Sequence, residues 1–330
     1  MCNPICSIII PYYNVPSELV NRCLNSILNQ YWGDYIYEVI FVNDGSPLPL
    51  DESTKNIFKQ FPLFTLIEQE NQGPGIARNK GIKISNSKYL LFLDSDDYWQ
   101  LNTFHFLLPH IIKENYDIIK FSTQGFDPLQ KHHIFETQTG CEFMANNNLI
   151  KGVCSYCYKT EFIKKHHILM PNIHNAEDDV FLYYSFYHAS KCLFTNIPLY
   201  LYNRERENSL TKNNITKKAY YILQGLKELS LFNIEQQQKD INITQKKALN
   251  RAFYTIIIDY LYKVCTSSIS TSEKKAHINA LSQITTIKPL PNIKINFKYS
   301  IFKICSYNYY LLQALAKTIN YIYKFQGKTY

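Results

Sequence analysis

Residues 89–99 read Tyr-Leu-Leu-Phe-Leu-Asp-Ser-Asp-Asp-Tyr-Trp, so five apolar or aromatic residues run directly into a cluster of acids. A short apolar run of this kind is typical of a strand buried inside a sheet. In an open α/β sheet, ligands bind in the crevice beyond the carboxyl ends of the strands, because the loops there face one another. We therefore expect Asp94, Asp96 and Asp97 at a ligand-binding edge.

The segments before residue 89 alternate between strand and helix patterns. Residues 6–11, 37–42 and 64–68 are short runs rich in β-branched and aromatic residues, as buried strands are. Residues 17–30 carry apolar side chains at helical spacing, and 75–85 predict a second helix. Alternation of this type predicts the α/β fold class, with a mostly parallel, Rossmann-like sheet.

The pattern is mixed between residues 101 and 202 and becomes helical beyond residue 214. One strand-like run occupies 116–122. Helical patterns occupy 103–115, 178–189, 217–232, 244–264 and 309–323. We predict a first domain of residues 1–214 and a C-terminal helical region of residues 215–330.

The charge is concentrated near the C-terminus. The chain of 330 residues has a net charge of +8, and residues 274–330 contain nine lysines and no acid. These lysines are interleaved with Tyr, Phe, Ile and Leu, without a nucleic-acid-binding motif, which favours peripheral contact with an anionic membrane over nucleic acid. The alternative is that the region packs on the first domain. No apolar run reaches the ~20 residues that cross a bilayer.

The cysteines predict a reducing compartment. There are nine, an odd number without regular spacing, and no signal-peptide pattern precedes them. We expect a cytoplasmic protein, peripheral at the inner face of the membrane. Cys154 and Cys157 form a lone CxxC pair, which we interpret as buried thiols and not as a metal site.

Six short motifs follow one another along the chain: SIIIPYYN (7–14), EVIFVNDGS (38–46), NQGPGIARNKGI (71–82), LFLDSDDYW (92–99), AEDDVF (176–181) and YNRERENSLT (202–211). In this order and spacing they resemble glycosyltransferase family 2, the inverting GT-A enzymes that build bacterial polysaccharides. The resemblance covers residues 5–211 and implies a GT-A domain, a nucleotide-sugar donor and a divalent metal, Mn²⁺ or Mg²⁺.

Asp94-Ser95-Asp96 resembles the DxD motif of that family. A diphosphate leaving group needs its charge neutralised, and carboxylate oxygens hold the hard cation that does so. The resemblance implies Asp96 as the metal ligand, Asp94 near the ribose of the donor and Asp97 near its sugar. An acidic loop that caps the following helix is the alternative reading.

Two earlier motifs resemble the nucleotide pocket of the family. Pro11, Tyr13 and Asn14 belong to the first, in which Tyr13 would stack on the base. Asp44 belongs to the second and would accept a hydrogen bond from a ring N–H, which favours uracil and hence a UDP-sugar. Ordinary turns would explain both motifs as well.

Arg78 follows the glycines of the third motif. It is expected to face the phosphates of the donor or to order the acidic loop. A plain surface arginine is the alternative reading. Arg206 lies in the last motif and resembles the basic loop that closes over the diphosphate in this family.

The acids 177–179 resemble the ED motif that supplies the catalytic base. An inverting transfer needs one carboxylate to take the proton of the acceptor hydroxyl. Asp178 matches the position of the base, and Asp179 is the reserve candidate for the same role. Glu177 is expected to bind the acceptor or to have a structural role. Acids at the start of a helix are also favourable without any catalytic role.

The resemblance implies transfer of a sugar to a hydroxyl of a glycan or lipid-linked acceptor, in lipopolysaccharide, lipooligosaccharide, O-antigen or capsule synthesis. The rival enzyme is a metal-dependent nucleotidyltransferase, which would release pyrophosphate. The rival without catalysis is a glycan-binding subunit. His166, His167 and His174 precede the ED motif and are interpreted as ordinary core or surface histidines, with acceptor contact as the alternative.

Overall fold

The computed structural model describes residues 3–122, 137–149, 152–203 and 215–285, together with five positions between 310 and 318. Contacts divide the chain into two units. The first contains residues up to 140 and 150–207, and the second contains 141–149 and the chain from 208 onward. The segment 141–149 therefore groups with the C-terminal helices, whereas the sequence placed it within residues 1–214.

The first unit is built on a seven-stranded sheet with the order β3-β2-β1-β4-β7-β6-β8. Strands β1 to β4 are mutually parallel, β7 is antiparallel to β4 and β6, and β6 is parallel to β8. The predicted mostly parallel α/β sheet is confirmed. The strands are β1 (Cys6–Tyr12), β2 (Tyr37–Asp44), β3 (Leu63–Gln69), β4 (Tyr89–Phe92), β6 (Ile118–Ser122), β7 (Tyr156–Lys159) and β8 (Cys192–Pro198).

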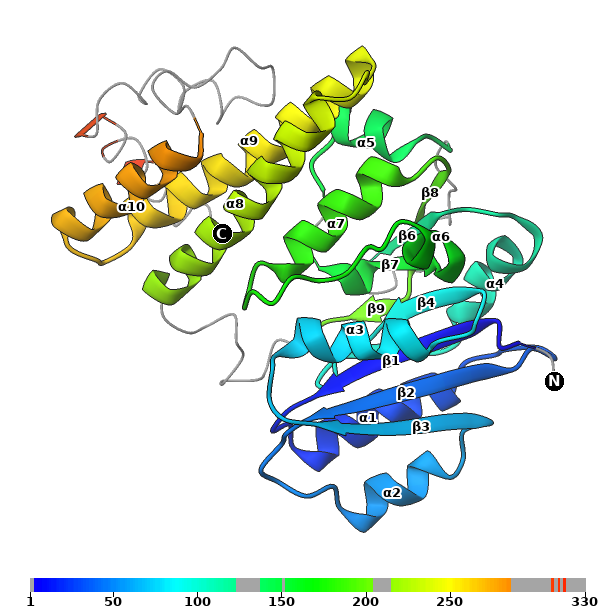
Figure 1. Cartoon of the computed structure of the whole chain (residues 1–330). Coiled ribbons are helices and arrows are strands. Elements are labelled where there is room, and N and C mark those ends of the chain that lie inside the picture. The colour runs from blue at the N-terminus through cyan, green and yellow to red at the C-terminus, as the bar shows by residue number, and fades with distance from the viewer. Residues whose placement is uncertain are drawn as a thin grey trace. The chain divides into compact units, whose positions relative to one another are not determined.

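The order of the strands determines which face each helix covers. The chain moves outward from β1 to β3 and then returns to β4 beside β1. Right-handed crossovers then place α1 and α2 on one face of the sheet and α3 on the other, as Figure 1 shows. These helices are α1 (Ser17–Leu28), α2 (Glu52–Phe58) and α3 (Pro74–Ile84).

The remaining elements of the first unit are short. A two-stranded ribbon pairs β5 (Tyr98–Trp99) with β9 (Tyr200–Leu201). Strands of two residues carry no periodic pattern, so the sequence did not predict them. The other elements are α4 (Phe104–Lys113), η1 (Val153–Ser155), α6 (Thr160–Lys165) and α7 (Glu177–His188).

The register of the sheet brings the first motifs to one edge. Tyr12 at the end of β1 pairs with Asn43 at the end of β2, and Asn43 pairs with Glu68 of β3. Gly45 has φ +68°, and a Cβ there would lie 2.8 Å from the backbone nitrogen of Asn71. Only glycine fits such a turn, which lets the loop after β2 approach the loop before α3.

The second unit contains α5 (Gly140–Asn146) from residue 141 on, and the helices α8 (Ile215–Gln237), α9 (Ile243–Thr266) and α10 (Thr271–Ile284). Helix α9 starts with a capping box formed by Asn242 and Gln245, and α10 with one formed by Ser270 and Glu273. The predicted helices over 217–232 and 244–264 are present, and α10 is an addition to them. The predicted helix over 309–323 lies almost wholly outside the described residues.

The basic C-terminal region is described only in part. Lys274 is buried, and its Nζ donates to the carbonyl oxygen of Cys265, 3.0 Å away. This lysine therefore caps the end of α9. Among the positions that the structure describes, none belongs to a helix both long and apolar enough to cross a bilayer. Residues 286–309 and 319–330 lie outside the described part, so membrane contact stays a prediction.

The seven cysteines among the described residues are all free and buried, including Cys154 and Cys157. Burial raises the pKa of both thiols above the ordinary value. Protonated, buried thiols are poor nucleophiles and poor metal ligands.

Candidate functional site

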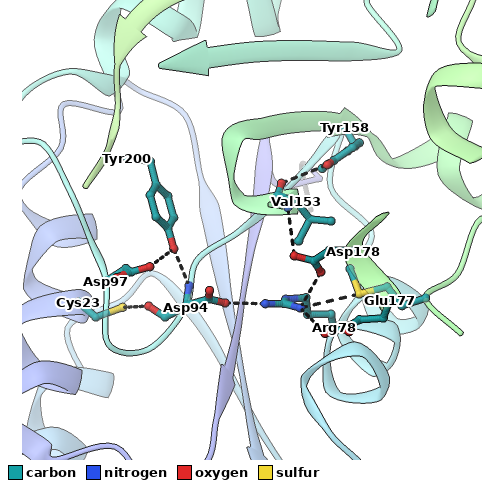
Figure 2. Close-up of polar contacts among 10 residues, drawn as sticks. Cys23, Arg78, Asp94, Asp97, Val153, Tyr158, Glu177, Asp178 and Tyr200 are labelled. Atoms are coloured by element: carbon teal, nitrogen blue, oxygen red, sulfur yellow. Dashed lines mark hydrogen bonds and ion pairs between the residues drawn. The ribbon is translucent and has the colours of Figure 1, made fainter. Parts of the chain in front are cut away.

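Arg78 lies at the centre of a buried cluster of acids. It stands in the second turn of α3, and its side chain is 5% exposed. Its Nη2 is 2.6 Å from Oδ1 of Asp94, and its Nη1 is 3.2 Å from Oδ1 of Asp178. The same Nη1 lies 3.8 Å from Oε1 of Glu177. Figure 2 shows the guanidinium between the acidic loop after β4 and the start of α7.

The charges in this cluster do not balance, because one cation faces three carboxylates. Burial disfavours the charged form of Arg78, but the negative charges of Asp94 and Asp178 oppose this effect, and its pKa lies well above the ordinary value. Arg78 is therefore permanently charged. Asp94 and Asp178 alone outnumber the one guanidinium, so the site is net negative even when Glu177 keeps its proton, which suits binding of a further cation.

Glu177 is the most deeply buried acid of the cluster. Burial and the charge of Asp178 raise its pKa to about 7, against the opposing effect of Arg78. Its Oε2 is buried and has no hydrogen-bond partner. A Cβ on Gly75 would lie 2.9 Å from Cγ of Glu177. Gly75 of the third motif therefore lets α3 approach α7, a packing role that the sequence pattern did not reveal.

Asp178 is held at two points and remains partly accessible. Besides its ion pair with Arg78, its Oδ2 accepts a hydrogen bond from the backbone N–H of Val153, 3.4 Å away. Burial raises its pKa and Arg78 lowers it. Its side chain is 30% exposed, which leaves room for contact with a substrate. Of the two candidates for the base, Asp178 is the one that contacts Arg78; Asp179 follows it in the same turn.

Asp97 joins the acidic loop to the ribbon strand β9. Its Oδ2 accepts from the hydroxyl of Tyr200 at 2.5 Å, and its Oδ1 accepts from the backbone N–H of Asn203 at 2.7 Å. The same hydroxyl accepts from the backbone N–H of Asp94 at 3.5 Å (Figure 2). Burial and the charge of Asp94 raise the pKa of Asp97 to about 7. Each oxygen of Asp97 thus binds one protein group, and contact between Asp97 and the donor sugar stays a prediction.

Asp44 has a comparable role in the nucleotide motif. Its side chain is buried, and Oδ1 accepts from Nε2 of Gln69 at 2.6 Å and from the backbone N–H of Gln72 at 2.8 Å. Its Oδ2 accepts from the backbone N–H of Gly73 at 2.8 Å. Asp44 thus fixes the loop before α3. Contact between Asp44 and a base stays a prediction.

The first motif presents one exposed ring at the same edge. Pro11 is buried, whereas Tyr13 is 47% exposed. Asn14 has φ +50°, and its backbone N–H donates to Oγ of Ser46 at 3.0 Å, so the first two motifs are joined directly. The exposed ring of Tyr13 is free of the core packing that would prevent stacking on a flat ligand.

The acidic loop offers hard ligands for a metal but not a complete set. No cluster of three or more His, Cys, Asp or Glu suited to a metal ion occurs in the described ranges. One oxygen of Asp94 is paired with Arg78, both oxygens of Asp97 bind protein groups, and Asp96 is half-buried. Carboxylate oxygens from Asp96 and Asp94 fit a Mg²⁺- or Mn²⁺-like ion that completes its shell with water and diphosphate.

The other residues predicted for the site either lie apart from the Arg78 cluster or are not among the residues that the structure describes. Arg206 lies in the segment 204–214, which the structure does not describe. The ring of His174 lies 3.4 Å from where a Cβ of Gly73 would stand, so it covers the loop fixed by Asp44. His166 stacks on His188 with 4.6 Å between the ring centroids.

Comparison with known proteins relates about half of the chain to a known family. Residues 7–168 match the family described as Glycosyl transferase family 2. The uncharacterised glycosyltransferase EpsJ of Bacillus subtilis (strain 168) is 31% identical over 222 residues, which is 63% of this chain and 63% of EpsJ. TarS of Staphylococcus aureus (strain Mu50), a poly(ribitol-phosphate) beta-N-acetylglucosaminyltransferase, is 24% identical over 75% of this chain and 44% of TarS. The chain thus spans less than two thirds of either relative.

A solved structure shows the same fold over nearly the whole chain. The crystal structure of S. aureus TarS 1-349 in complex with UDP-GlcNAc has a TM-score of 0.67 and 19% identity, over 98% of this chain and 93% of that one. The predicted GT-A fold with C-terminal helices is therefore confirmed.

The raised pKa of Glu177 predicts how stability depends on pH. The folded protein keeps a proton on Glu177 up to about pH 7, whereas the unfolded chain releases it near 4.5, so stability falls as the pH rises between these values. Glu177→Gln removes this titration. We expect the wild type to lose on the order of 1–3 kcal/mol more than Glu177→Gln between about pH 5 and pH 8, by urea unfolding in chelator.

Glu18→Gln provides the control, because Glu18 is an exposed acid on α1. Its pH profile should follow that of the wild type. Parallel profiles for the wild type and Glu177→Gln would show that Glu177 is ionised in the folded protein at neutral pH.

Proposed function

Because residues 7–168 belong to glycosyltransferase family 2, we propose that this chain moves a sugar from a UDP-linked donor to a hydroxyl of a bacterial surface polymer, with inversion at the anomeric carbon. The observation that carries the proposal is the contact of Arg78 with both Asp94 and Asp178. It places the acidic loop suited to a diphosphate beside a carboxylate suited to act as a base.

The donor half of the site lies at the edge where β1, β2 and β4 end. Tyr13 offers an exposed ring for the base, and Asp44 has four acceptor positions of which protein groups use three. The remaining position suits the ring N–H of uracil. The crystal structures of TarS with UDP-GlcNAc and with UDP support a uridine nucleotide.

For the acceptor we favour a polyol-phosphate polymer of the cell wall. TarS, by its name, glycosylates poly(ribitol-phosphate). Lipopolysaccharide and capsule belong to the same broad class of hydroxyl-bearing surface glycans, but the name of TarS points to poly(ribitol-phosphate). The choice of acceptor proposed here is therefore narrower than the range of surface glycans expected from the sequence.

The chemistry assigned to Asp178 is proton removal in a single displacement. The acceptor hydroxyl oxygen bonds to the anomeric carbon, the bond from that carbon to the diphosphate breaks, and the hydroxyl proton passes to a carboxylate oxygen of Asp178. UDP leaves with the bonding electrons. The carboxylate must be ionised to accept the proton, and Arg78 favours that state against burial. Partial exposure of Asp178 then lets the proton escape to water.

A divalent cation held by Asp96 would neutralise the charge that develops on the departing diphosphate. We expect EDTA to abolish transfer and added Mn²⁺ or Mg²⁺ to restore it. Asp96→Asn should fold normally and lose most activity, whereas Asp240→Asn, between α8 and α9, should keep it. Full transfer in the presence of EDTA would refute a role for a metal.

Two measurements test the proposal: the identity of the products and the effect of replacing the proposed base. With UDP-GlcNAc and ribitol-phosphate oligomers, the protein should release UDP and form a β-linked product. Asp178→Asn should reduce turnover by at least ~100-fold, the usual scale for loss of a general base, while calorimetry shows donor binding close to that of the wild type.

Asp179→Asn is the matched control, since it removes a neighbouring acid of the same turn. If Asp179→Asn is inactive and Asp178→Asn is not, the base is Asp179. Release of pyrophosphate would instead identify a nucleotidyltransferase, and no turnover with any nucleotide sugar would favour a glycan-binding subunit.

A further inference from the structure

A pocket of about 620 Å³ lies on the face of the sheet that α1 covers. Its walls come from α1, from the segment that follows the acidic loop and from β9. Arg78 stands on α3, on the opposite face of the sheet. The residues that matter for the pocket are Arg22, Asn25, Asn29, Tyr98, Trp99 and Leu201. We call it the Arg22 pocket.

Arg22 presents an unused pair of hydrogen-bond donors. Its Cζ lies 4.3 Å from the ring centroid of Tyr98, so the guanidinium stacks on the ring. Its Nε and Nη2 are buried and have no hydrogen-bond partner. These two nitrogens form one edge of the guanidinium, and their N–H bonds run parallel. Such a fork matches two oxygens of one phosphate or carboxylate.

The other described arginines differ from Arg22 in this respect. Arg78 pairs with carboxylates, and Arg251 donates to the carbonyl oxygens of Met144 and Asn147. Arg22 has no ion pair with any acid in the part of the chain that the structure describes. Stacking on Tyr98 offsets only part of the cost of burying a cation. An oxyanion that draws the flexible side chain into the pocket would satisfy both donors.

The rest of the lining also favours an acceptor-rich, negatively charged ligand. Nε1 of Trp99 is a second buried donor without a partner. Asn25 and Asn29 are exposed and add amide groups at the rim. None of the described side chains that line the pocket is acidic. An anionic group would therefore meet donors without repulsion from a carboxylate in the lining.

The pocket is joined to the acidic loop by hydrogen bonds from α1. The thiol of Cys23, next to Arg22, contacts the carbonyl oxygen of Asp94 at 3.6 Å. The backbone N–H of Trp99 donates to Oγ of Ser26 at 2.9 Å. Tyr98 directly follows Asp97 in the chain. A ligand in the pocket would thus contact residues 98–101, the segment that directly follows the acidic loop of the candidate donor site.

We propose that the Arg22 pocket binds a phosphate group of the acceptor polymer, away from the hydroxyl that reacts. This inference rests on the proposed function, because a polyol-phosphate chain carries phosphates at regular intervals along its length. Such a site would hold the polymer on the enzyme by a unit that is not itself modified. A phosphate of the nucleotide is the other source of the same chemistry.

Steady-state kinetics with UDP-GlcNAc and ribitol-phosphate oligomers test the proposal. We expect Arg22→Gln to raise the KM for the oligomer about ten-fold or more, as loss of a charge-assisted pair does. The kcat at saturating oligomer and the KM for UDP-GlcNAc should change less than about two-fold. Arg22→Lys keeps the charge but not the two parallel N–H donors. Its KM for the oligomer should therefore lie between those of the wild type and Arg22→Gln.

Lys59→Gln is the control for charge alone, because Lys59 is exposed on the same unit, just after α2. Its oligomer KM should match that of the wild type. The proposal is wrong if Arg22→Gln folds with an unchanged melting temperature and its oligomer KM rises no more than that of Lys59→Gln. It is equally wrong if the KM for UDP-GlcNAc rises in parallel.

Binding is tested separately by the ¹⁵N–¹H resonance of Nε of Arg22, assigned from Arg22→Gln. Titration with ribitol 5-phosphate should shift this resonance, and titration with UDP should not. A shift with UDP alone would assign the pocket to the nucleotide and refute the acceptor site. This titration needs no turnover, so it remains decisive if the wild type transfers no sugar and the proposed function itself fails.

Discussion

The rest of the site depends on the burial of one guanidinium, that of Arg78. An unpaired buried cation is costly, so its partners must be supplied by neighbouring elements. Asp94 supplies one from the loop after β4, and Asp178 supplies another from α7, 100 positions further along the chain than Arg78. The packing of α3 against α7 follows, and Gly75 leaves the room that Glu177 needs. Electrostatics and packing therefore select the same arrangement.

Four acids of the motifs form two pairs with different physical roles. Asp44 and Asp97 accept hydrogen bonds from backbone N–H groups and so fix loops in place. Asp94 and Asp178 contact Arg78, and Asp178 stays partly exposed. The first pair organises the edge of the sheet, and the second pair joins the acidic loop to the proposed base. The Arg22 pocket adjoins this arrangement, because the segment that follows Asp97 forms part of the wall of the pocket.

Much of the fold could be predicted because buried parallel strands have a strong apolar signal. Strands β1, β2 and β4 were found in this way, and their ends locate Asp44 and Asp94. Strand β7, of only four residues, was missed, since Tyr-Cys-Tyr-Lys carries no clear pattern. Hydrogen-bond partners could not be predicted from the sequence either, because the contacts of Asp97 with Tyr200 and Asn203 arise only from tertiary structure. Likewise, Arg22 could not be told from an ordinary surface arginine of an amphipathic helix.

The most direct test of the account is the pKa of Asp178, measured by ¹³C NMR of its side chain with and without Arg78. In a Glu177→Gln background, which removes the coupled neighbour, Arg78→Met should raise this pKa, since Arg78 is the group that opposes burial. Lys80→Met, on the same helix, should leave it unchanged. An unchanged or lower pKa in Arg78→Met would contradict the claim that Arg78 holds the proposed base in its ionised form.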